Sequence, residues 1–137
     1  MKTNVTGFTL VELITVMLII GILAVTALTK ILPSDTLQLQ ASRDSIVAAF
    51  YSAQQLAMVR QSSVEVRTSV NQIDVLVDNV SVSAGGVSYP LVMLKGQTLN
   101  IASFGYDRLG HTTGSQLYLT QNGRVVTIVV DDSGYVK

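Results

Sequence analysis

The stretch GFTLVELITVMLIIG, residues 7–21, holds one charged side chain, Glu12, in an otherwise apolar run. The run extends to Leu28, and residues 8–28 carry no other charge. About 21 residues in a helix that rises about 1.5 Å per residue span roughly 30 Å, which is the thickness of the bilayer hydrocarbon. On an insertion scale, about 13 Leu, Ile, Val and Phe residues outweigh one acidic residue. The stretch therefore predicts a membrane-spanning helix and raises the question of what its carboxylate does.

Two simpler interpretations of this segment account for it less well. A secretory signal peptide cut after Ala27 would use Val25 and Ala27 as its small residues, but such peptides place a positive residue next to a clean apolar core. Here polar residues separate Lys2 from the core, and Glu12 interrupts it. A plain one-span anchor leaves Glu12 without the partner that an intramembrane carboxylate normally has.

The rest of the chain has the size of one small domain. Of the 137 residues, about 30 belong to the apolar start, and the remaining ~100 suffice for one hydrophobic core. The formal net charge is zero, so no global basic field attracts nucleic acid or an anionic membrane. The absence of cysteine excludes disulfides, thiolate metal sites and cysteine nucleophiles. No nucleophile–base pair, phosphate-binding loop or paired-carboxylate signature is present, so we expect neither an enzyme nor a bound cofactor or metal.

The start of the chain matches a known processing signal. Gly7 followed by FTLVEL and a long apolar helix resembles the class III signal of type IV pilins and type II secretion pseudopilins. The resemblance implies that a prepilin peptidase cuts after Gly7, removes the leader of residues 1–7 and methylates the new amino group of Phe8. Glu12 then becomes the fifth residue of the mature chain, a position that the family reserves for glutamate.

The chemistry of these residues agrees with the arrangement known in the family. A new α-amino group, with a reference pKa of about 8, would be a cation in or near hydrocarbon, and burying either charge alone is costly. The resemblance implies that Glu12 reaches the Phe8 amine of a neighbouring subunit and sets the register of assembly. Gly21 and Ala24, one turn apart, are candidates for close helix packing, although a tolerated membrane glycine explains Gly21 equally well.

The resemblance implies a structural role. We expect a minor pilin or pseudopilin, held in the bacterial inner membrane by one span with its head in the periplasm. It would assemble into a type II secretion pseudopilus or a type IV pilus that supports secretion or adhesion. Expected partners are other subunits, the prepilin peptidase and methyltransferase, the inner-membrane assembly platform and a cytoplasmic ATPase. The run GILAVTA, residues 21–27, resembles mannose-sensitive haemagglutinin pilins, and the choice among secretion, adhesion and DNA-uptake systems stays open.

A second helical segment follows the apolar run. Lys30 is expected at the bilayer surface, and Pro33 should kink or break the helix because proline removes a hydrogen bond and clashes with the preceding turn. Ser34 and Asp35 are candidates to cap the restarted helix. We therefore divide the chain into a membrane or filament-core helix over 8–32, an amphipathic helix over 33–62 and a β-rich head over 63–137. Residues at helical spacing form one apolar stripe in the second helix: Leu39, Ile46, Ala49, Phe50, Ala53, Leu56 and Ala57.

After Ser63 the hydrophobic pattern changes to a period of two. Residues 64–69 and 73–78 alternate and are joined by a short Val-Asn turn, which predicts a hairpin. Further strands are expected at about 80–83, 87–94 and 97–102, with Pro90 marking an edge or irregular position. A last hairpin joins 116–120 to 125–130 through Asn122-Gly123, a strong turn signal. A helix followed by an antiparallel sheet makes the head α+β.

The C-terminal half carries a second, weaker resemblance. The stretch SFGYDRLGHTTGSQLYLT and the following NGRVVTIVVDDSGYVK are similar to the ends of minor pseudopilin H and FimT-like minor pilins. The residues in the expected order are Phe104, Gly110, Gly123 and Gly134.

DNA binding is the alternative function to test against this pattern. The FimT-like members proposed to bind DNA end in Gly-Arg-x-Arg, whereas this chain ends in Gly-Tyr-Val-Lys after two aspartates. Convergence of Arg108, Arg124 and Lys137 in space is the condition for a phosphate site, and one lysine beside Asp131 and Asp132 makes a poor one.

Two further groups of residues are weak site candidates. His111, the only histidine, lies in a Gly-Thr-rich loop without catalytic or metal-binding partners in the local sequence. Asp131 and Asp132 resemble a fragment of a calcium loop, but adjacent residues of a strand face opposite ways and the other ligands are missing. A polar turn is the better interpretation.

Overall fold

The computed structural model describes residues 7–31, 34–60 and 62–137. The chain divides into two compact units, Met1–Ser34 and Asp35–Lys137. The predicted kink at Pro33 and the side chain of Lys30 lie outside what the structure describes.

Helix α1 (Leu10–Ile31) forms the first unit. Its 18-residue window Leu10–Ala27 is long and apolar enough to cross a membrane, and none of it is buried within the chain. Its large apolar side chains are exposed on every side, from 45% at Val16 to 74% at Leu10. A helix that is hydrophobic all round needs an apolar environment, such as lipid or other helices, around it.

Helix α2 (Ser34–Val59) is amphipathic and carries the head. Its predicted stripe is confirmed, because the stripe residues are buried apart from Leu56, which is half-buried. Phe50 meets Phe104 edge to face with ring centroids 5.0 Å apart, a geometry that adds to the stabilisation from apolar burial. The first turn holds Asp35, whose carboxylate accepts a hydrogen bond from Asn122 Nδ2 at 2.9 Å. The side chain of Ser34, the other candidate to cap α2, lies outside what the structure describes.

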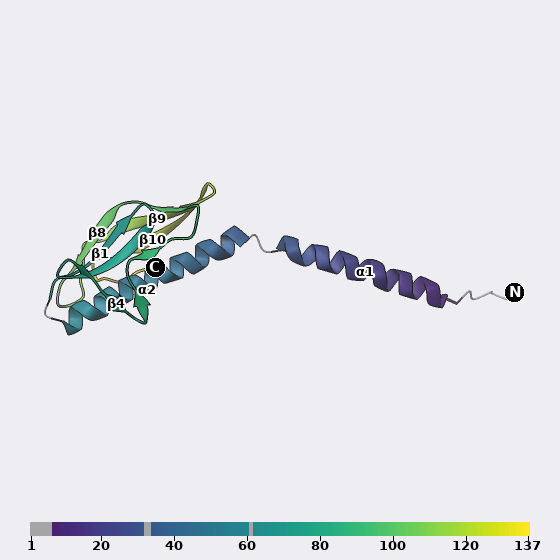
Figure 1. Cartoon of the computed structure of the whole chain (residues 1–137), viewed down its shortest axis with the longest axis horizontal. Helices are drawn as coiled ribbons and strands as arrows, with labels where there is room; N and C mark the ends of the chain where they lie inside the picture. Colours follow the sequence, from purple (N-terminus) through teal and green to yellow (C-terminus); the bar gives the residue numbers. More distant parts are fainter. Residues whose placement is uncertain (1–6, 32–33, 61) are drawn as a thin grey trace. The chain divides into compact units, whose positions relative to one another are not determined.

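The head contains two main antiparallel sheets on one side of α2 (Figure 1). The first has the order β3-β2-β1-β8 with β6 also paired to β2, and the second has the order β10-β9-β7; β4 and β5 form a separate hairpin. The strands are β1 (Val64–Ser69), β2 (Gln72–Val77), β3 (Val80–Ser81), β4 (Ser83–Ala84), β5 (Val87–Ser88), β6 (Leu91–Val92), β7 (Gln97–Leu99), β8 (Ala102–Tyr106), β9 (Ser115–Gln121) and β10 (Arg124–Val130).

Both predicted hairpins are confirmed. β1 pairs with β2 from Val64↔Val77 to Ser69↔Gln72, and β9 pairs with β10 along all of β10. In the β9–β10 turn, Asn122 and Gly123 have φ values of 50° and 76°, which is the backbone that the Asn-Gly pair favours. The α+β class predicted from the sequence is therefore correct.

Three of the predicted strands are wrong in their limits. The strand expected at about 80–83 is β3 in the first sheet followed by β4 in the separate hairpin, with Val82 between them. The strand expected at 87–94 is two short strands, β5 and β6, on either side of Tyr89-Pro90, where proline has no N–H to give to a ladder. The strand expected at 97–102 is β7 in one sheet followed by β8 in the other. The chain crosses between the sheets at Asn100 and Ile101, a change that an alternating sequence pattern does not record.

Candidate functional site

The start of α1 is a capping box formed by Thr9 and Glu12. Glu12 Oε2 accepts hydrogen bonds from the Thr9 N–H at 3.1 Å and the Thr9 hydroxyl at 3.0 Å. The Glu12 N–H donates to Thr9 Oγ1 at 3.2 Å. This reciprocal pattern satisfies donors at the helix start that have no partner within the helix. The Thr-x-x-Glu spacing is therefore the local reason that α1 begins at Leu10.

Gly7 and Phe8 lie before this helix start. Both are exposed, and the side chain of Phe8 is 83% accessible. The first helical backbone bond runs from the Leu13 N–H to the Thr9 carbonyl at 3.2 Å. Because the Glu12 N–H turns to the Thr9 hydroxyl, it does not extend the helix back to Phe8. The peptide between Gly7 and Phe8 is thus outside the helix.

The small residues Gly21 and Ala24 are exposed on α1. No heavy atom lies within 4 Å of a Cβ built at Gly21. The described part of the chain therefore leaves this position open to another helix, and provides no internal reason for a glycine there.

The three cations considered for DNA are not brought to one place. Arg124 begins β10 and bonds to Thr36 Oγ1 at the start of α2. Lys137 pairs with Val129 through its backbone, with N–H to O distances of 2.9 and 3.0 Å, and Val129 is about 17 Å along the strand from Arg124. Arg108 belongs to the loop after β8. Arg124 thus lies at the end of β10 remote from the loops that carry the other two cations.

Asp107 and Asp131 stabilise their loops through hydrogen bonds, and His111 takes part through its backbone N–H. Asp107 Oδ1 accepts the backbone N–H groups of Leu109 at 2.9 Å and His111 at 2.8 Å, and the bond from His111 holds the pKa of Asp107 below its usual range. Hydrogen bonds from Ser133 lower the pKa of Asp131 in the same way. In the described residues no group of three or more His, Asp and Glu is placed to hold a metal ion.

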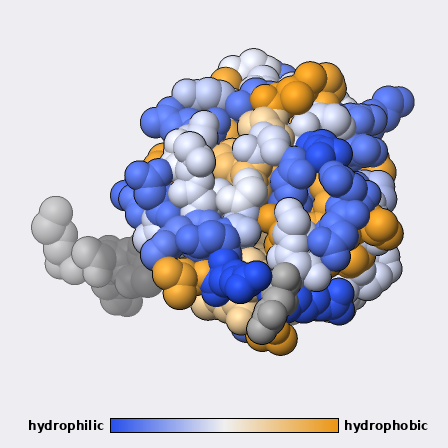
Figure 2. Space-filling view, turned by 90° about the vertical axis from the view of Figure 1, so that its left-hand side faces the viewer, coloured by the Kyte–Doolittle hydropathy of each residue, from blue (hydrophilic) through white to orange (hydrophobic). Residues whose placement is uncertain are grey.

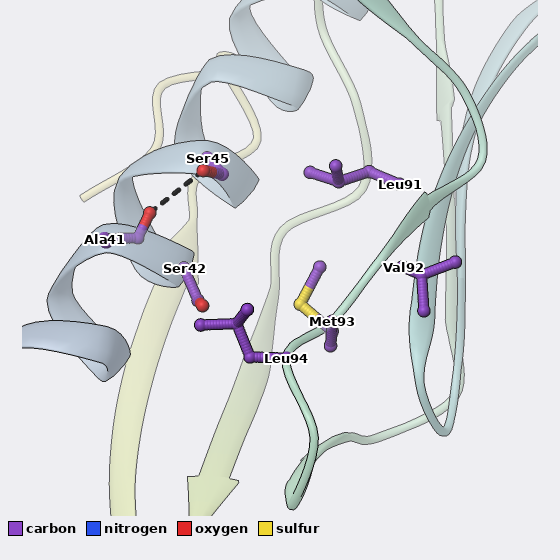
Figure 3. Close-up of a pocket in the computed structure, with 7 residues that line it drawn as sticks. All are labelled: Ala41, Ser42, Ser45, Leu91, Val92, Met93 and Leu94. Carbon is purple, nitrogen blue, oxygen red and sulfur yellow. Dashed lines mark hydrogen bonds between the residues drawn. The ribbon is translucent and has the colours of Figure 1, made fainter. Parts of the chain in front are cut away.

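The head has shallow hollows, and the one between α2 and residues 91–94 has no charged side chain in its described lining. This hollow has a volume of 190 Å³ and is lined by Ala41, Ser42, Ser45 and that segment. Leu91 and Leu94 extend toward α2, while Val92 lies on the other side of its strand (Figure 3). Ser45 Oγ in this hollow already donates to the Ala41 carbonyl at 2.9 Å. On the end of the head where α2 finishes, polar side chains dominate and apolar ones are scattered among them (Figure 2).

The comparisons with known proteins concern the N-terminal segment and the fold. Residues 2–28 match the model of the prokaryotic N-terminal methylation motif. The type IV minor pilin FimU of Pseudomonas aeruginosa is similar in structure, with a TM-score of 0.57, 14% identity and coverage of 76% of this chain and 90% of that one. The minor pseudopilin EpsH of the type 2 secretion system of Vibrio cholerae has a TM-score of 0.63, 13% identity and coverage of 73% and 94%. The chain carries the prokaryotic N-terminal methylation motif, and its fold is similar to those of this minor pilin and this minor pseudopilin. Among curated proteins none matches it.

In this pilin-like chain, sequence reasoning placed Gly7, Phe8 and Glu12 together and missed Thr9. The signal for Thr9 was present, because a threonine three residues before a glutamate at the start of an apolar run is a capping-box pattern. This capping signal was not used in the sequence analysis, because only the charge of Glu12 in the membrane was considered.

Proposed function

We propose that the pilin-like chain is the precursor of a minor pilin or pseudopilin, cut after Gly7, methylated at Phe8 and assembled through α1. The observation that supports this most strongly is the coincidence of the motif at 2–28 with a helix start two residues beyond the Gly7–Phe8 peptide. A peptidase needs access to the peptide that it cuts, and this peptide is exposed and outside α1.

Glu12 is arranged to serve as both a cap and a charge partner. Its Oε2 takes both bonds from Thr9, whereas Oε1 accepts none from the described residues. A neighbouring subunit's Phe8 ammonium therefore has a free carboxylate oxygen to bind while the capping box stays closed. Within hydrocarbon such a pair neutralises two charges whose separate burial is costly. This favours one axial register between neighbouring helices.

The exposed apolar surface of α1 suits both the membrane-anchored precursor and the assembled filament. Its apolar side chains are exposed on all sides, so lipid covers them in the precursor and neighbouring α1 helices cover them in the filament. We place the anchor in the bacterial inner membrane with the head on the periplasmic side, where the peptidase–methyltransferase and the assembly platform meet it. The system is a type II secretion pseudopilus or a type IV pilus.

Substitution of Glu12 tests this proposal. Glu12→Gln keeps an acceptor for the capping box and removes the charge, while Glu12→Val removes both. We expect both variants to insert and to be cut, and both to enter filaments at least about tenfold less than the parent, because a charge pair is lost. The measurement is the amount of the chain in sheared filaments relative to the amount in membranes.

Thr15→Val is the matched control, because it removes a polar group from the same helix. In the described part of the chain, the Thr15 hydroxyl bonds only the Val11 carbonyl, at 2.8 Å. Thr15→Val should enter filaments like the parent. Normal incorporation of Glu12→Gln would show that the charge of Glu12 is not needed and would contradict the proposal.

A further inference from the structure

The outer edge of β8 has backbone groups without partners. β8 is the last strand of its sheet and pairs only with β1. In antiparallel strands, successive residues direct their N–H and C=O groups to opposite sides. The Asp107 N–H just after β8 points to the His111 carbonyl at 2.9 Å, on the side away from β1. Ser103 and Gly105 therefore face that same side, and none of the described residues bonds their N–H and C=O groups there.

This edge is accessible and lies over the core. Gly105 is exposed, and a Cβ built on it meets nothing within 4 Å. The strand that follows β8 along the chain, β9, belongs to the other sheet. The inner residues of both strands, such as Phe104 and Leu117, are buried in one hydrophobic cluster. An extended chain placed beside β8 would thus have a backbone ladder on one side and an apolar floor beneath it.

The side chain of Asn100 marks one end of the β8 edge, and a hollow beside Asp107 marks the other. At one end the Asn100 side chain donates to the Gln116 carbonyl at 3.3 Å and accepts from the Tyr118 N–H at 2.6 Å, in place of a strand backbone. At the other end is a hollow of 250 Å³ whose lining includes Gly105, Asp107 and Thr112. Thr112 Oγ1 is buried and has no hydrogen-bond partner among the residues that the structure describes. A hydroxyl in this state is costly unless a further group binds it.

Sequence features that normally protect an edge are missing from β8. Proteins blunt exposed edges with lysine, proline or a bulge, because unpaired N–H and C=O groups recruit another strand. The residues of β8, ASFGY, include no charge and no proline, and their pairing with β1 is regular from Ala102 to Tyr106. Unlike an apolar face, such an edge specifies its occupant chemically, since only an extended backbone matches alternating donors and acceptors.

We propose that the outer edge of β8, between Asn100 and Asp107, binds an extended segment of a neighbouring subunit as an added strand. The inference rests on the proposed function for the identity of the partner. The segment would bond the N–H and C=O of Ser103 and Gly105 and direct an apolar side chain to the core beside Phe104. Assembly would then involve backbone pairing in the head as well as packing of α1.

Two substitutions at Gly105 separate strand addition from folding. Gly105→Pro removes the outward N–H and leaves the bonds to β1, which come from residues 102, 104 and 106, and proline is tolerated at sheet edges. Gly105→Ala keeps the N–H and is the matched control. We expect Gly105→Pro to enter filaments at least about tenfold less than the parent, because it loses about one backbone hydrogen bond and weakens the neighbouring ones. Gly105→Ala should enter filaments as well as the parent does.

Amide hydrogen exchange of the unmodified full-length chain provides a readout that does not depend on variant folding. The probes are the chain in detergent micelles and filaments sheared from cells. The Ser103 and Gly105 amides should exchange freely in micelles and at least about 100-fold more slowly in filaments. Equally fast exchange in both, with the chain present in filaments, overturns the added strand and leaves the proposed function intact. Absence of the chain from filaments overturns the proposed function and this inference together.

Discussion

Thr9 and Glu12 act as one unit at the start of α1. The motif is described by its glycine, aromatic residue and glutamate, yet the structure shows that the threonine between them supplies two donors and one acceptor to the glutamate. A capping residue of this kind is worth roughly 1 kcal/mol of helix stability. The helix start, and with it the exposure of the Gly7–Phe8 peptide, depends on this pair.

Removal of the Thr9 hydroxyl should fray the first turn of α1. In Thr9→Val the Glu12 N–H loses its acceptor, and we expect its exchange in detergent micelles to accelerate roughly fivefold, the equivalent of about 1 kcal/mol. Thr9→Ser keeps the hydroxyl and should exchange like the parent. Equal rates in Thr9→Val and the parent would show that the capping box does not hold the helix start.

At this scale the sequence predicts processing at Gly7 and Phe8, which stays a prediction, and it did not predict the hydrogen bonds between Thr9 and Glu12. Gly7, Phe8 and Glu12 follow from a fixed motif that is read without knowing the fold. The convergence of Arg108, Arg124 and Lys137 depended on tertiary placement, and the length of β10 separates Arg124 from the other two. Sequence distance alone does not provide that information.

Among the elements, α2 holds the head together through specific polar ties as well as its apolar stripe. Gln54 Nε2 donates to the Gly110 carbonyl at 3.0 Å and to the Ser133 carbonyl at 3.1 Å, which fixes two loops to the helix. The loops also touch each other, because a Cβ built at Gly134 would overlap the Gly110 carbonyl. The φ of Gly134 is 81°, a region that other residues rarely adopt.

Gly134→Ala should therefore destabilise the head. The added methyl group clashes with the Gly110 carbonyl and the backbone is held at positive φ, so we expect the free energy of unfolding to fall by at least about 2 kcal/mol. Gly105→Ala, which has neither problem, should stay within about 0.5 kcal/mol of the parent. The measurement is urea unfolding of the full chain in micelles. Equal stability of the two variants would contradict the close approach of the two loops.

A buried polar chain links α2 to the end of the second sheet where Gln97 of β7 pairs with Gln121 of β9. Ser42 donates to Gln97 Oε1 at 2.7 Å, Gln97 Nε2 donates to Gln121 Oε1 at 3.0 Å, and Gln121 Nε2 donates to Gln38 Oε1 at 3.0 Å. Gln97 and Gln121 are 3% and 4% exposed. Buried groups of this kind are costly when their partners are removed.

Gln121→Leu should cost about 1–3 kcal/mol of head stability, because Gln97 Nε2 loses its acceptor while buried. Gln97→Leu with Gln121→Leu should cost less than the sum of the two single changes, since the unpaired group is then absent. Gln40→Leu, at an exposed position of α2, is the control and should stay within about 0.5 kcal/mol. Additive costs of the two single changes would show that the glutamines do not act as one network.

The sequence predicted the elements with strong local signals and missed those set by tertiary contacts. The two hairpins follow from period-two patterns and short turns, and the α2 face follows from apolar spacing. Gln97 and Gln121 were not expected in the core, because their burial depends on each other and on Ser42. The exchange of sheets between β7 and β8 depends on Asn100, whose side chain replaces a strand backbone for β9.

The whole molecule combines a unit that needs partners with a unit that has its own core. α1 exposes nearly all of its apolar surface, whereas the buried residues of the head form one cluster around α2. The division matches what composition indicated, because the excess of apolar residues lies mostly in one segment. A chain built in this way has a use for its first unit only within lipid or within an assembly of similar helices.

The central claim is that the chain functions as a processed, filament-forming subunit, and the chemical state of its N-terminus tests this most directly. Intact-mass and fragment-ion spectrometry of the chain recovered from membranes and filaments reads that state. The account predicts a mature chain that begins with N-methylated Phe8. A chain that retains Met1 through Gly7, or one that begins at Leu28 after cleavage behind Ala27, would contradict it.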